Sequence, residues 1–384
     1  MTRRQLAALA AAGALAGRKT ARAASKYTGA LDGFESKVDG AAFDPLIYSR
    51  KLYEKAPLRL TFRATSRKQA EAWQNKLRAK LTELLGMPPR SRAPLNPITL
   101  ETREFPGYRR EKLVFSSEPG LHVLAYLLTP SKGQAPHATV ICVPGHGRGV
   151  DDIVGIDAEG RDRTGKEGYQ HDFALQVVEQ GLAAAAIEPI AFGCRRDPAA
   201  RKGALGRSSC QPIAGSALLL GQTMIGWRVR DVMRTIDWIE TRKELDATRV
   251  GCMGISGGGT CTLFSSAMEP RIRAAMVSGY LCTFRDSIFS LSHCMDNYVP
   301  GILNWAEMYD IAGLIAPRPL FAESGEKDDI FPIDAFRASF ARVRKVYEVL
   351  GAADRIEQET FNAAHSFHGV KGLAFLKQRL TAPA

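Results

Sequence analysis

One serine in this chain is flanked by glycines in a pattern that suits nucleophilic chemistry. The pentapeptide GISGG at 254–258 directly follows an apolar run and directly precedes the helical stretch 260–268. A serine on a sharp turn between a strand and a helix exposes its hydroxyl in a strained backbone conformation, and flanking glycines leave room for that turn. A plain glycine-rich turn is the alternative. We expect Ser256 to be an acyl-transfer nucleophile and the amide of Gly257 to donate to the developing oxyanion.

The acid of such a site is expected on a loop after a later strand. Triads with a nucleophile on this kind of turn follow the order Ser, acid, His along the chain. The apolar run at 319–322 is followed by two adjacent aspartates, Asp328 and Asp329, and then by Pro332. Either carboxylate can orient an imidazole, and both also suit a solvated turn or a helix cap. We expect Asp328 to be the acid and keep Asp329 as the alternative.

Three histidines follow the predicted nucleophile. His293 precedes the acid and is therefore in the wrong order, whereas His368 stands where a helix is predicted to start. His365 lies on a loop between a strand predicted over 356–361 and that helix. We expect His365 to take the proton from Ser256 and return it to the leaving alcohol, while the acid fixes its tautomer.

A second oxyanion donor is expected on the loop PGHGRG at 144–149, which follows a predicted strand. Its three glycines allow the backbone amides to turn toward the serine. The amide of Arg148 is the first choice and that of Gly147 the second, and His146 is expected to be a structural neighbour. The loop lacks the GxxxxGK[ST] order of a phosphate-binding loop, so nucleotide binding is not indicated.

These residues require a scaffold that brings several strand ends together. After a hairpin predicted at 111–128, near-continuous apolar runs alternate with helical periods, which is typical of a mostly parallel sheet covered on both faces. The strands are predicted at 138–143, 183–187, 250–253, 274–277 and 319–322, and the helices at 66–85, 173–181, 223–243, 332–350 and 370–380. The sequence therefore predicts an α/β fold with an N-terminal helical extension.

Several motifs together resemble one group of proteins over about residues 70 to 380. They are RVRDVMRTIDW at 228–238, DATRVGCMGISGG at 246–258, NYVPG at 297–301, APRPL at 316–320, GEKDDIFP at 325–332 and the H-x-F at 365–367. This set resembles the dienelactone-hydrolase-like and acetyl-xylan-esterase-like α/β hydrolases of bacteria. The resemblance implies an α/β-hydrolase fold, Asp328 as the acid, His365 as the base and an oxyanion loop at 146–148.

The nucleophile departs from the pattern of true dienelactone hydrolases, which use cysteine where this chain has Ser256. This departure favours ester substrates. We expect a carboxylic-ester hydrolase for short acyl groups, including carbohydrate-linked ones. A peptidase of the prolyl-oligopeptidase type is an alternative, although it usually carries an N-terminal propeller that the preceding ~110 residues are too few to form. A non-enzymatic binding protein of this fold is a second alternative. Such a protein normally lacks a triad member, whereas this chain has all three candidates in the expected order.

The segment 279–317 is predicted to be an insertion of irregular or short helical structure close to the nucleophile. It carries apolar and aromatic side chains at Tyr280, Phe284, Phe289, Met295, Tyr298, Trp305 and Tyr309. These either pack the insertion onto the core or form the wall of an acyl pocket. A compact aromatic wall predicts a preference for acyl chains from acetyl to butyryl.

Residues 1–23 have the charged, apolar and small-residue parts of an export signal, and Arg3-Arg4 suit the twin-arginine type. An amphipathic helix is the alternative reading of this stretch. Its apolar run of about 12 residues is shorter than the ~20 needed for a stable membrane span. We expect cleavage near Ala23, a periplasmic or extracellular location, an arm and helix over 24–100 and a catalytic domain over 101–384.

Charge and cysteine usage argue against several other classes. Five of the 52 basic residues precede the predicted cleavage point, which leaves 47 basic and 40 acidic residues, a net charge of +7 spread along the chain. Nucleic-acid binding is therefore not expected. The seven cysteines form no CxxC pair and no histidine cluster has ligand spacing, so neither a metal nor another cofactor is expected. Disulfides between Cys194 and Cys210 and between Cys282 and Cys294 stay open.

Overall fold

The computed structural model describes residues 29–87, 93–163 and 165–382, which form two units. The predicted export signal lies outside the described residues. The first unit ends at Lys55 and contains the short helix η1 (Gly40–Phe43) and the helix α2 (Pro45–Glu54). Asp44 caps α2 by accepting hydrogen bonds from the amides of Leu46 and Ile47. No residue of α2 is buried.

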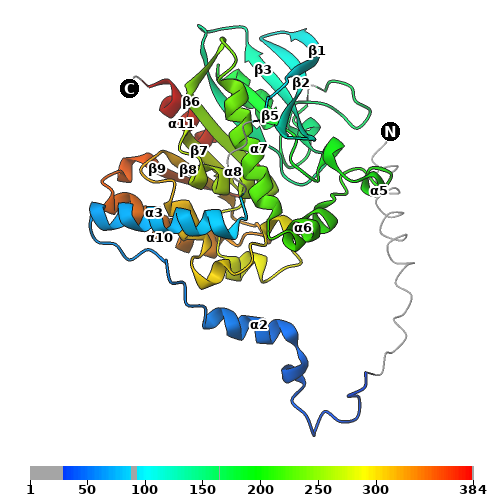
Figure 1. Cartoon of the computed structure of the whole chain (residues 1–384), viewed down its shortest axis with the longest axis vertical. Coiled ribbons are helices and arrows are strands. Elements are labelled where there is room, and N and C mark those ends of the chain that lie inside the picture. Colours follow the sequence, from blue (N-terminus) through cyan, green and yellow to red (C-terminus); the bar gives the residue numbers. More distant parts are fainter. Residues whose placement is uncertain (1–28, 88–92, 164, 383–384) are drawn as a thin grey trace. The chain divides into compact units, whose positions relative to one another are not determined.

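The second unit, from Ala56 onward, contains a nine-stranded sheet (Figure 1). Its strands are β1 (Ile98–Phe105), β2 (Tyr108–Glu118), β3 (Leu121–Pro130), β4 (His137–Val143), β5 (Ala183–Ile187), β6 (Leu245–Ile255), β7 (Ile272–Ser278), β8 (Leu320–Gly325) and β9 (Ile356–Phe361). The spatial order is β1-β2-β3-β5-β4-β6-β7-β8-β9. The neighbours from β5 to β9 pair in parallel, and β1 to β3 add an antiparallel edge. The predicted fold class is confirmed.

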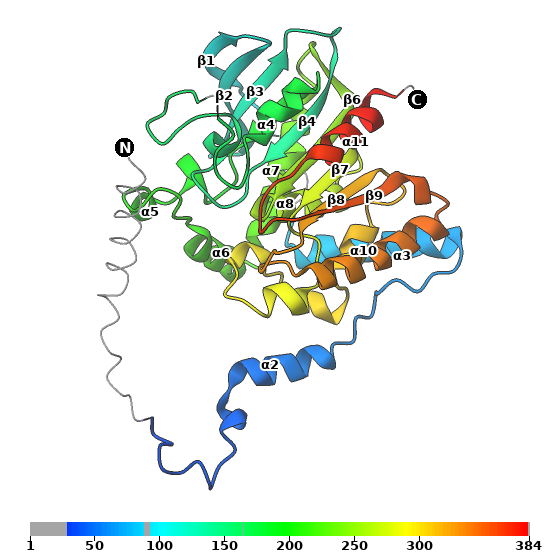
Figure 2. The same cartoon turned by 180° about the vertical axis from the view of Figure 1, so that it is seen from behind.

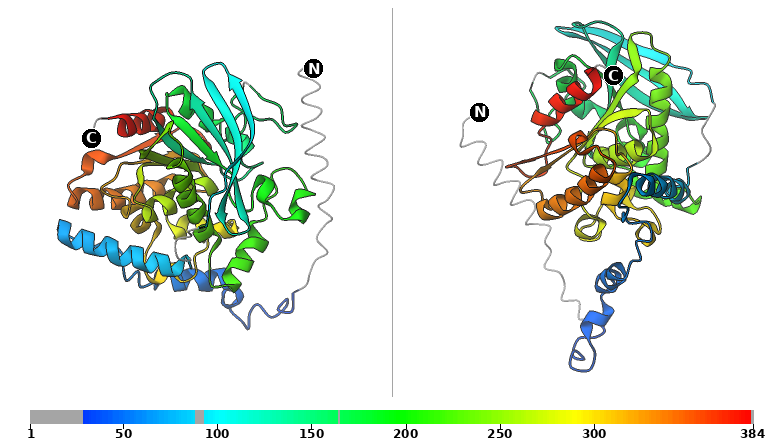
Figure 3. Two further views of the ribbon diagram at one scale, coloured as in Figure 1. Left: turned by 45° about the horizontal axis from the view of Figure 1, so that its top comes forward. Right: turned by 90° about the vertical axis from the view of Figure 1, so that its left-hand side faces the viewer.

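Helices cover both faces of this sheet, as Figures 1 and 2 show from opposite sides. One face packs against α3 (Arg67–Leu84), α7 (Met224–Ile239), α8 (Gly257–Met268) and α10 (Ile333–Val349), and the other against α4 (Phe173–Glu179) and α11 (Val370–Thr381). Successive residues of a strand point to opposite faces, so Ile141 joins the first core while Cys142 joins the second. Burial on both faces explains the continuous apolar runs of the central strands. The sheet twists from edge to edge, which two further views show (Figure 3).

The structure confirms the hairpin and the apolar runs, and it adds elements that the sequence pattern does not predict. The strand β1 is exposed along almost its whole length, so its residues follow no apolar alternation. The helices α5 (Pro198–Arg201) and α6 (Cys210–Leu219) lie between β5 and α7. Leu219 at the end of α6 and Leu220 directly after it are both exposed, so the apolar residues of this stretch do not follow a helical period.

The segment 279–317 contains short helices joined by irregular stretches. The helices are η4 (Phe284–Ile288), η5 (Met295–Asn297), η6 (Ile302–Asn304) and α9 (Met308–Gly313). The chain before α3 lies against it, because the amide of Leu60 donates to the carbonyl of Trp305 at 2.7 Å and the amide of Phe62 to Asp310 at 2.9 Å. No helix in the described ranges is long and apolar enough to cross a membrane.

Candidate active site

Ser256 stands on a sharp turn between β6 and α8. Its backbone has φ 57° and ψ −122°, a conformation that side-chain-bearing residues rarely adopt and that costs on the order of 1–3 kcal/mol. A Cβ atom on Gly254 would lie 2.5 Å from the carbonyl oxygen of Val143, and one on Gly258 would lie 1.9 Å from the same oxygen. The glycines are therefore required by the close approach of β4, and the turn holds the serine at the end of the parallel strands.

Asp328 and His365 are brought together from two later loops. Asp328 follows β8, and His365 lies between β9 and α11. Asp328 Oδ2 is 2.7 Å from His365 Nδ1, while its Oδ1 accepts from the amides of Ile330 and Phe331 at 2.9 and 3.0 Å. The aspartate side chain is 1% exposed. A carboxylate held in this way directs the Nδ1 proton toward itself, which leaves Nε2 free to accept a proton.

The alternative acid and bases have other surroundings. Asp329 is exposed. His293 Nε2 is 2.8 Å from Ser287 Oγ, and His368 Nε2 is 3.8 Å from the carboxylate of Glu359. Of the three histidines considered, His365 is the one that meets Asp328.

Ser256 and His365 line a common pocket of about 420 Å³. Its other lining residues are His146, Tyr169, Gly257, Thr260, Leu291, Ser292, His293, Cys294, Asn297, Ile330 and Phe331. The rings of Tyr169 and Phe331 both stack against the imidazole of His365, with centroids 5.5 and 5.7 Å away. These contacts restrict the imidazole to the pocket that contains the serine.

Tyr169 is a site residue that the sequence did not predict. Its hydroxyl donates to the carbonyl of His146 at 2.8 Å and interacts with the side chain of Ser256, and its carbonyl accepts from the amide of Phe367. Burial raises the pKa of this phenol. Tyr169 thus connects the loop at 144–149, Ser256 and the segment that follows His365. It lies in an irregular loop without a motif, so no sequence signal distinguishes it from other tyrosines.

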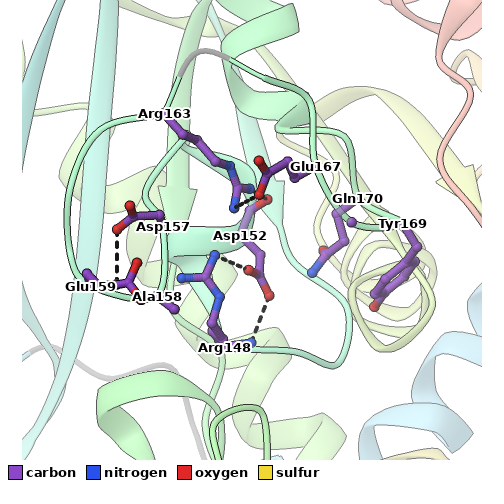
Figure 4. A pocket seen from close by; sticks show the side chains of 10 residues that line it. Arg148, Asp152, Asp157, Ala158, Glu159, Arg163, Glu167, Tyr169 and Gln170 are labelled. Atoms are coloured by element: carbon purple, nitrogen blue, oxygen red, sulfur yellow. Dashed lines mark hydrogen bonds and ion pairs between the residues drawn. The ribbon is translucent and has the colours of Figure 1, made fainter. Parts of the chain in front are cut away.

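The loop at 144–149 lies beside Ser256, but its amides are not equally available. The Arg148 amide donates to Asp152 Oδ2 at 2.8 Å, and its guanidinium pairs with the same aspartate. Figure 4 shows Arg148 among the residues of a second, charged pocket. Within the described hydrogen bonds, the amides of His146 and Gly147 are not engaged. This arrangement disfavours Arg148, the first choice from the sequence, because Asp152 already satisfies its amide, and it leaves the amide of Gly147, the second choice, available.

Glu188 fixes this loop to the sheet. Its carboxyl group is fully enclosed and accepts a hydrogen bond from the amide of Val150 at 3.1 Å. Cβ atoms on Gly149 and Gly193 would lie 2.2 and 1.9 Å from its oxygens, so both glycines are needed for the close approach. Burial raises the pKa of Glu188 to about 8, which favours a neutral acid in the folded protein.

The prediction that aromatic side chains of the insertion form the pocket wall names the wrong residues. None of the seven side chains singled out in the insertion lines the pocket; Tyr280 and Phe284, for example, are buried in the core. The insertion does border the pocket, but through Leu291, Cys294 and Asn297 and their neighbours. Burial in the core accounts for Tyr280 and Phe284, whereas Tyr298 is exposed, and the composition of the stretch does not distinguish these positions from the pocket wall.

All seven cysteines are free thiols. The pairs left open from the sequence, Cys194 with Cys210 and Cys282 with Cys294, are not bonded in the structure. Cys194 is exposed, whereas Cys210 lies beside Cys294 in a group with His146 and Asp296. These residues come from separate loops and helices. Their distance in the chain explains why no ligand spacing is visible in the sequence.

The fold and this site geometry define an α/β hydrolase. Residues 47–368 match the Abhydrolase family, and the chain belongs to this family. A proposed hydrolase of Bacillus subtilis (strain 168), YtaP, is 26% identical over 287 residues, which cover 72% of this chain and 89% of that protein.

Solved structures of esterases share the fold. A proposed acetyl xylan esterase from Bacteroides fragilis superposes with a TM-score of 0.71 and 20% identity, covering 88% of this chain and 90% of that one. A glucuronoyl esterase from Solibacter usitatus superposes with a TM-score of 0.59 and 15% identity, covering 84% and 97%. The expected likeness to acetyl-xylan-esterase-like α/β hydrolases is therefore confirmed at the level of the fold.

Proposed function

We propose that the protein is a carboxylic-ester hydrolase that uses Ser256 as nucleophile, His365 as general base and acid, and Asp328 as the orienting acid. The observation that carries the proposal is the 2.7 Å pair between Asp328 and His365 in a pocket shared with Ser256. An imidazole held in one tautomer beside a strained serine is the arrangement that acyl transfer requires.

In the proposed reaction, Ser256 Oγ attacks the ester carbonyl carbon and its proton passes to His365 Nε2. The negative charge that develops on the carbonyl oxygen is stabilised by the amides of Gly257, at the start of α8, and Gly147. The bond to the alcohol then breaks, and His365 returns the proton to the leaving oxygen. Water attacks the acyl-enzyme by the same proton transfers and releases the acid.

The substrate class proposed is a short-acyl ester, with carbohydrate-linked acetyl esters included. The similarity in fold to an acetyl xylan esterase and a glucuronoyl esterase supports an ester of a sugar polymer. The pocket of about 420 Å³ also has to hold part of the alcohol, which favours acyl groups from acetyl to butyryl. Export to the periplasm or the medium, predicted from residues 1–23, would bring the enzyme to polymeric substrates.

The experiment is a comparison of kcat/KM for p-nitrophenyl esters of increasing acyl length, beside acetylated xylan and a proline-containing peptide. We expect hydrolysis of the esters with a maximum between acetyl and butyryl. A pocket open to long chains would instead gain about 0.8 kcal/mol, or about fourfold, for each further methylene. A profile rising through octanoyl contradicts the short-acyl proposal, and cleavage of the peptide without ester hydrolysis supports the peptidase alternative.

A further inference from the structure

Four potential metal ligands converge beside the active-site pocket. His146 comes from the loop after β4, Cys210 is the first residue of α6, and Cys294 and Asp296 belong to the segment around η5. One ligand atom of each residue lies within 4.8 Å of those of the other three. We propose that these four residues, here named the Cys–His cluster, bind one zinc ion in a structural role.

The chemistry of the donors fits zinc. Zinc is bound in proteins by cysteine sulfur, histidine nitrogen and carboxylate oxygen, and structural zinc sites have four ligands in tetrahedral arrangement. At metal–ligand distances of about 2.0–2.3 Å, tetrahedral ligand atoms lie roughly 3.3–3.8 Å apart. In the cluster His146 Nε2 is 3.9 Å from Cys210 Sγ. Small side-chain shifts therefore suffice to bring the four donors around one ion.

The charges of the surroundings match a divalent ion. Arg228 is 1% exposed; its Nη1 donates to Asp296 Oδ2, and its Nη2 lies 3.6 Å from Cys210 Sγ. Two thiolates and one carboxylate carry three negative charges, of which the guanidinium offsets one. The remaining two equal the charge of Zn²⁺. On binding, each thiol loses its proton to solvent as its sulfur bonds to the metal, so no oxidation or reduction takes place.

Outer hydrogen bonds orient the cluster, as is usual for metal sites. The Asn297 side-chain amide donates to Asp296 Oδ1 at 3.0 Å and to the carbonyl of Cys294 at 3.2 Å. Arg228 is itself fixed by donating to the carbonyl of Ile190 at 2.7 Å. The carboxylate thus keeps its position without the ion.

The position of the cluster gives the ion a clear structural effect. It would join the oxyanion loop, the start of α6 and the insertion that borders the pocket. His146 and Cys294 also line that pocket, which provides an entry path for the ion. This inference does not depend on the ester-hydrolase proposal, because the metal takes no part in the reaction.

The test is metal analysis and cobalt substitution of the full chain. After incubation with zinc chloride and extensive dialysis, we expect about one equivalent of bound zinc per chain. Cobalt(II) should give thiolate-to-metal charge-transfer bands and the intense visible bands of tetrahedral coordination. Both signals should be lost in Cys210→Ser and Cys294→Ser and kept in Cys194→Ser, which changes an exposed cysteine outside the cluster.

X-ray absorption of zinc-loaded wild-type protein provides a second measurement that does not depend on the folding of any variant. We expect two sulfur and two nitrogen or oxygen neighbours. Absence of stoichiometric zinc, or zinc without sulfur neighbours, overturns the proposal. Alkylation and mass measurement before and after reduction provide a further check: a Cys210–Cys294 disulfide in the purified protein would also contradict the zinc site, because it removes both thiol ligands.

Discussion

The imidazole of His365 is bound on one side only: its Nδ1 lies 2.7 Å from Asp328 Oδ2, and its Nε2 has no hydrogen-bond partner among the described residues. A buried, unpartnered nitrogen is costly unless a function requires it. In the proposed reaction this nitrogen receives the proton of Ser256. The unsatisfied atom is thus the one to which the mechanism assigns the proton transfer.

Replacing Asp328 with asparagine should reduce kcat by about 10⁴-fold, because the amide no longer holds the required tautomer of the imidazole. Asp329→Asn is a matched control, since Asp329 is the adjacent residue but is exposed. Steady-state kinetics with p-nitrophenyl acetate measures both variants. A larger loss of kcat in Asp329→Asn than in Asp328→Asn would show that Asp329, and not Asp328, is the acid.

Ser256→Ala should abolish ester hydrolysis, with a loss on the order of 10⁶ in kcat, and should leave the fold intact. The substitution removes one hydroxyl and relieves no backbone strain, because alanine also has a Cβ atom. Circular dichroism and thermal unfolding check the fold, and Ser216→Ala on the exposed side of α6 provides the control. Retention of more than about a tenth of wild-type turnover is incompatible with a serine nucleophile.

Tyr169→Phe should lower kcat about five- to tenfold, since a net hydrogen bond contributes about 1 kcal/mol and this hydroxyl fixes the oxyanion loop at the His146 carbonyl. The stacking on His365 is retained in the variant. Tyr48→Phe, at an exposed tyrosine of α2, is the control. An unchanged kcat would show that the loop keeps its position without this hydrogen bond.

Glu188 should make the free energy of unfolding depend on pH. Burial raises its folded-state pKa to about 8, whereas the pKa of a glutamate in the unfolded chain is about 4.3. Between these values the folded state binds more protons than the unfolded state, so stability falls as pH rises. The stabilisation that protonated Glu188 gives the folded state is complete below the unfolded pKa and is lost as the pH rises through the folded pKa.

Glu188→Gln removes this ionisation, so the free energy of unfolding of the variant relative to wild type should increase from pH 5 to about pH 8 and then level off. Urea unfolding across this range measures the difference, with Glu179→Gln at an exposed position as control. A difference that is constant with pH would mean that Glu188 is not held in its neutral form.

The central sheet could be predicted from the sequence because its strands are buried on both faces and their side chains are almost uniformly apolar. The strand β1 could not, because its exposed residues carry no such pattern. Ser256, Asp328 and His365 were identifiable because each follows a predicted strand and the chain order is restrictive. The structure pairs Asp328 with His365 and places Ser256 in the same pocket as His365, while the catalytic roles of the three residues stay predictions.

Residues whose importance arises from contacts between distant segments were not visible in the sequence. Tyr169 contacts the loop at 144–149 only through the folding of an irregular stretch, and Asp152 accepts a hydrogen bond from the amide of Arg148, four residues away. Cys210 and Cys294 meet across more than eighty residues of chain. Spacing rules apply to ligands and donors within one element or loop, so they do not report such pairs.

The central claim is that Ser256 is the nucleophile, and covalent labelling tests it most directly. Diisopropyl fluorophosphate should transfer one phosphoryl group to Ser256 Oγ with release of fluoride, and peptide mass spectrometry should locate the label on the peptide that contains residues 254–258. Excess short-acyl ester should protect the protein from labelling. A fully active protein that takes up no label, or takes it up at another residue with loss of activity, would contradict the account.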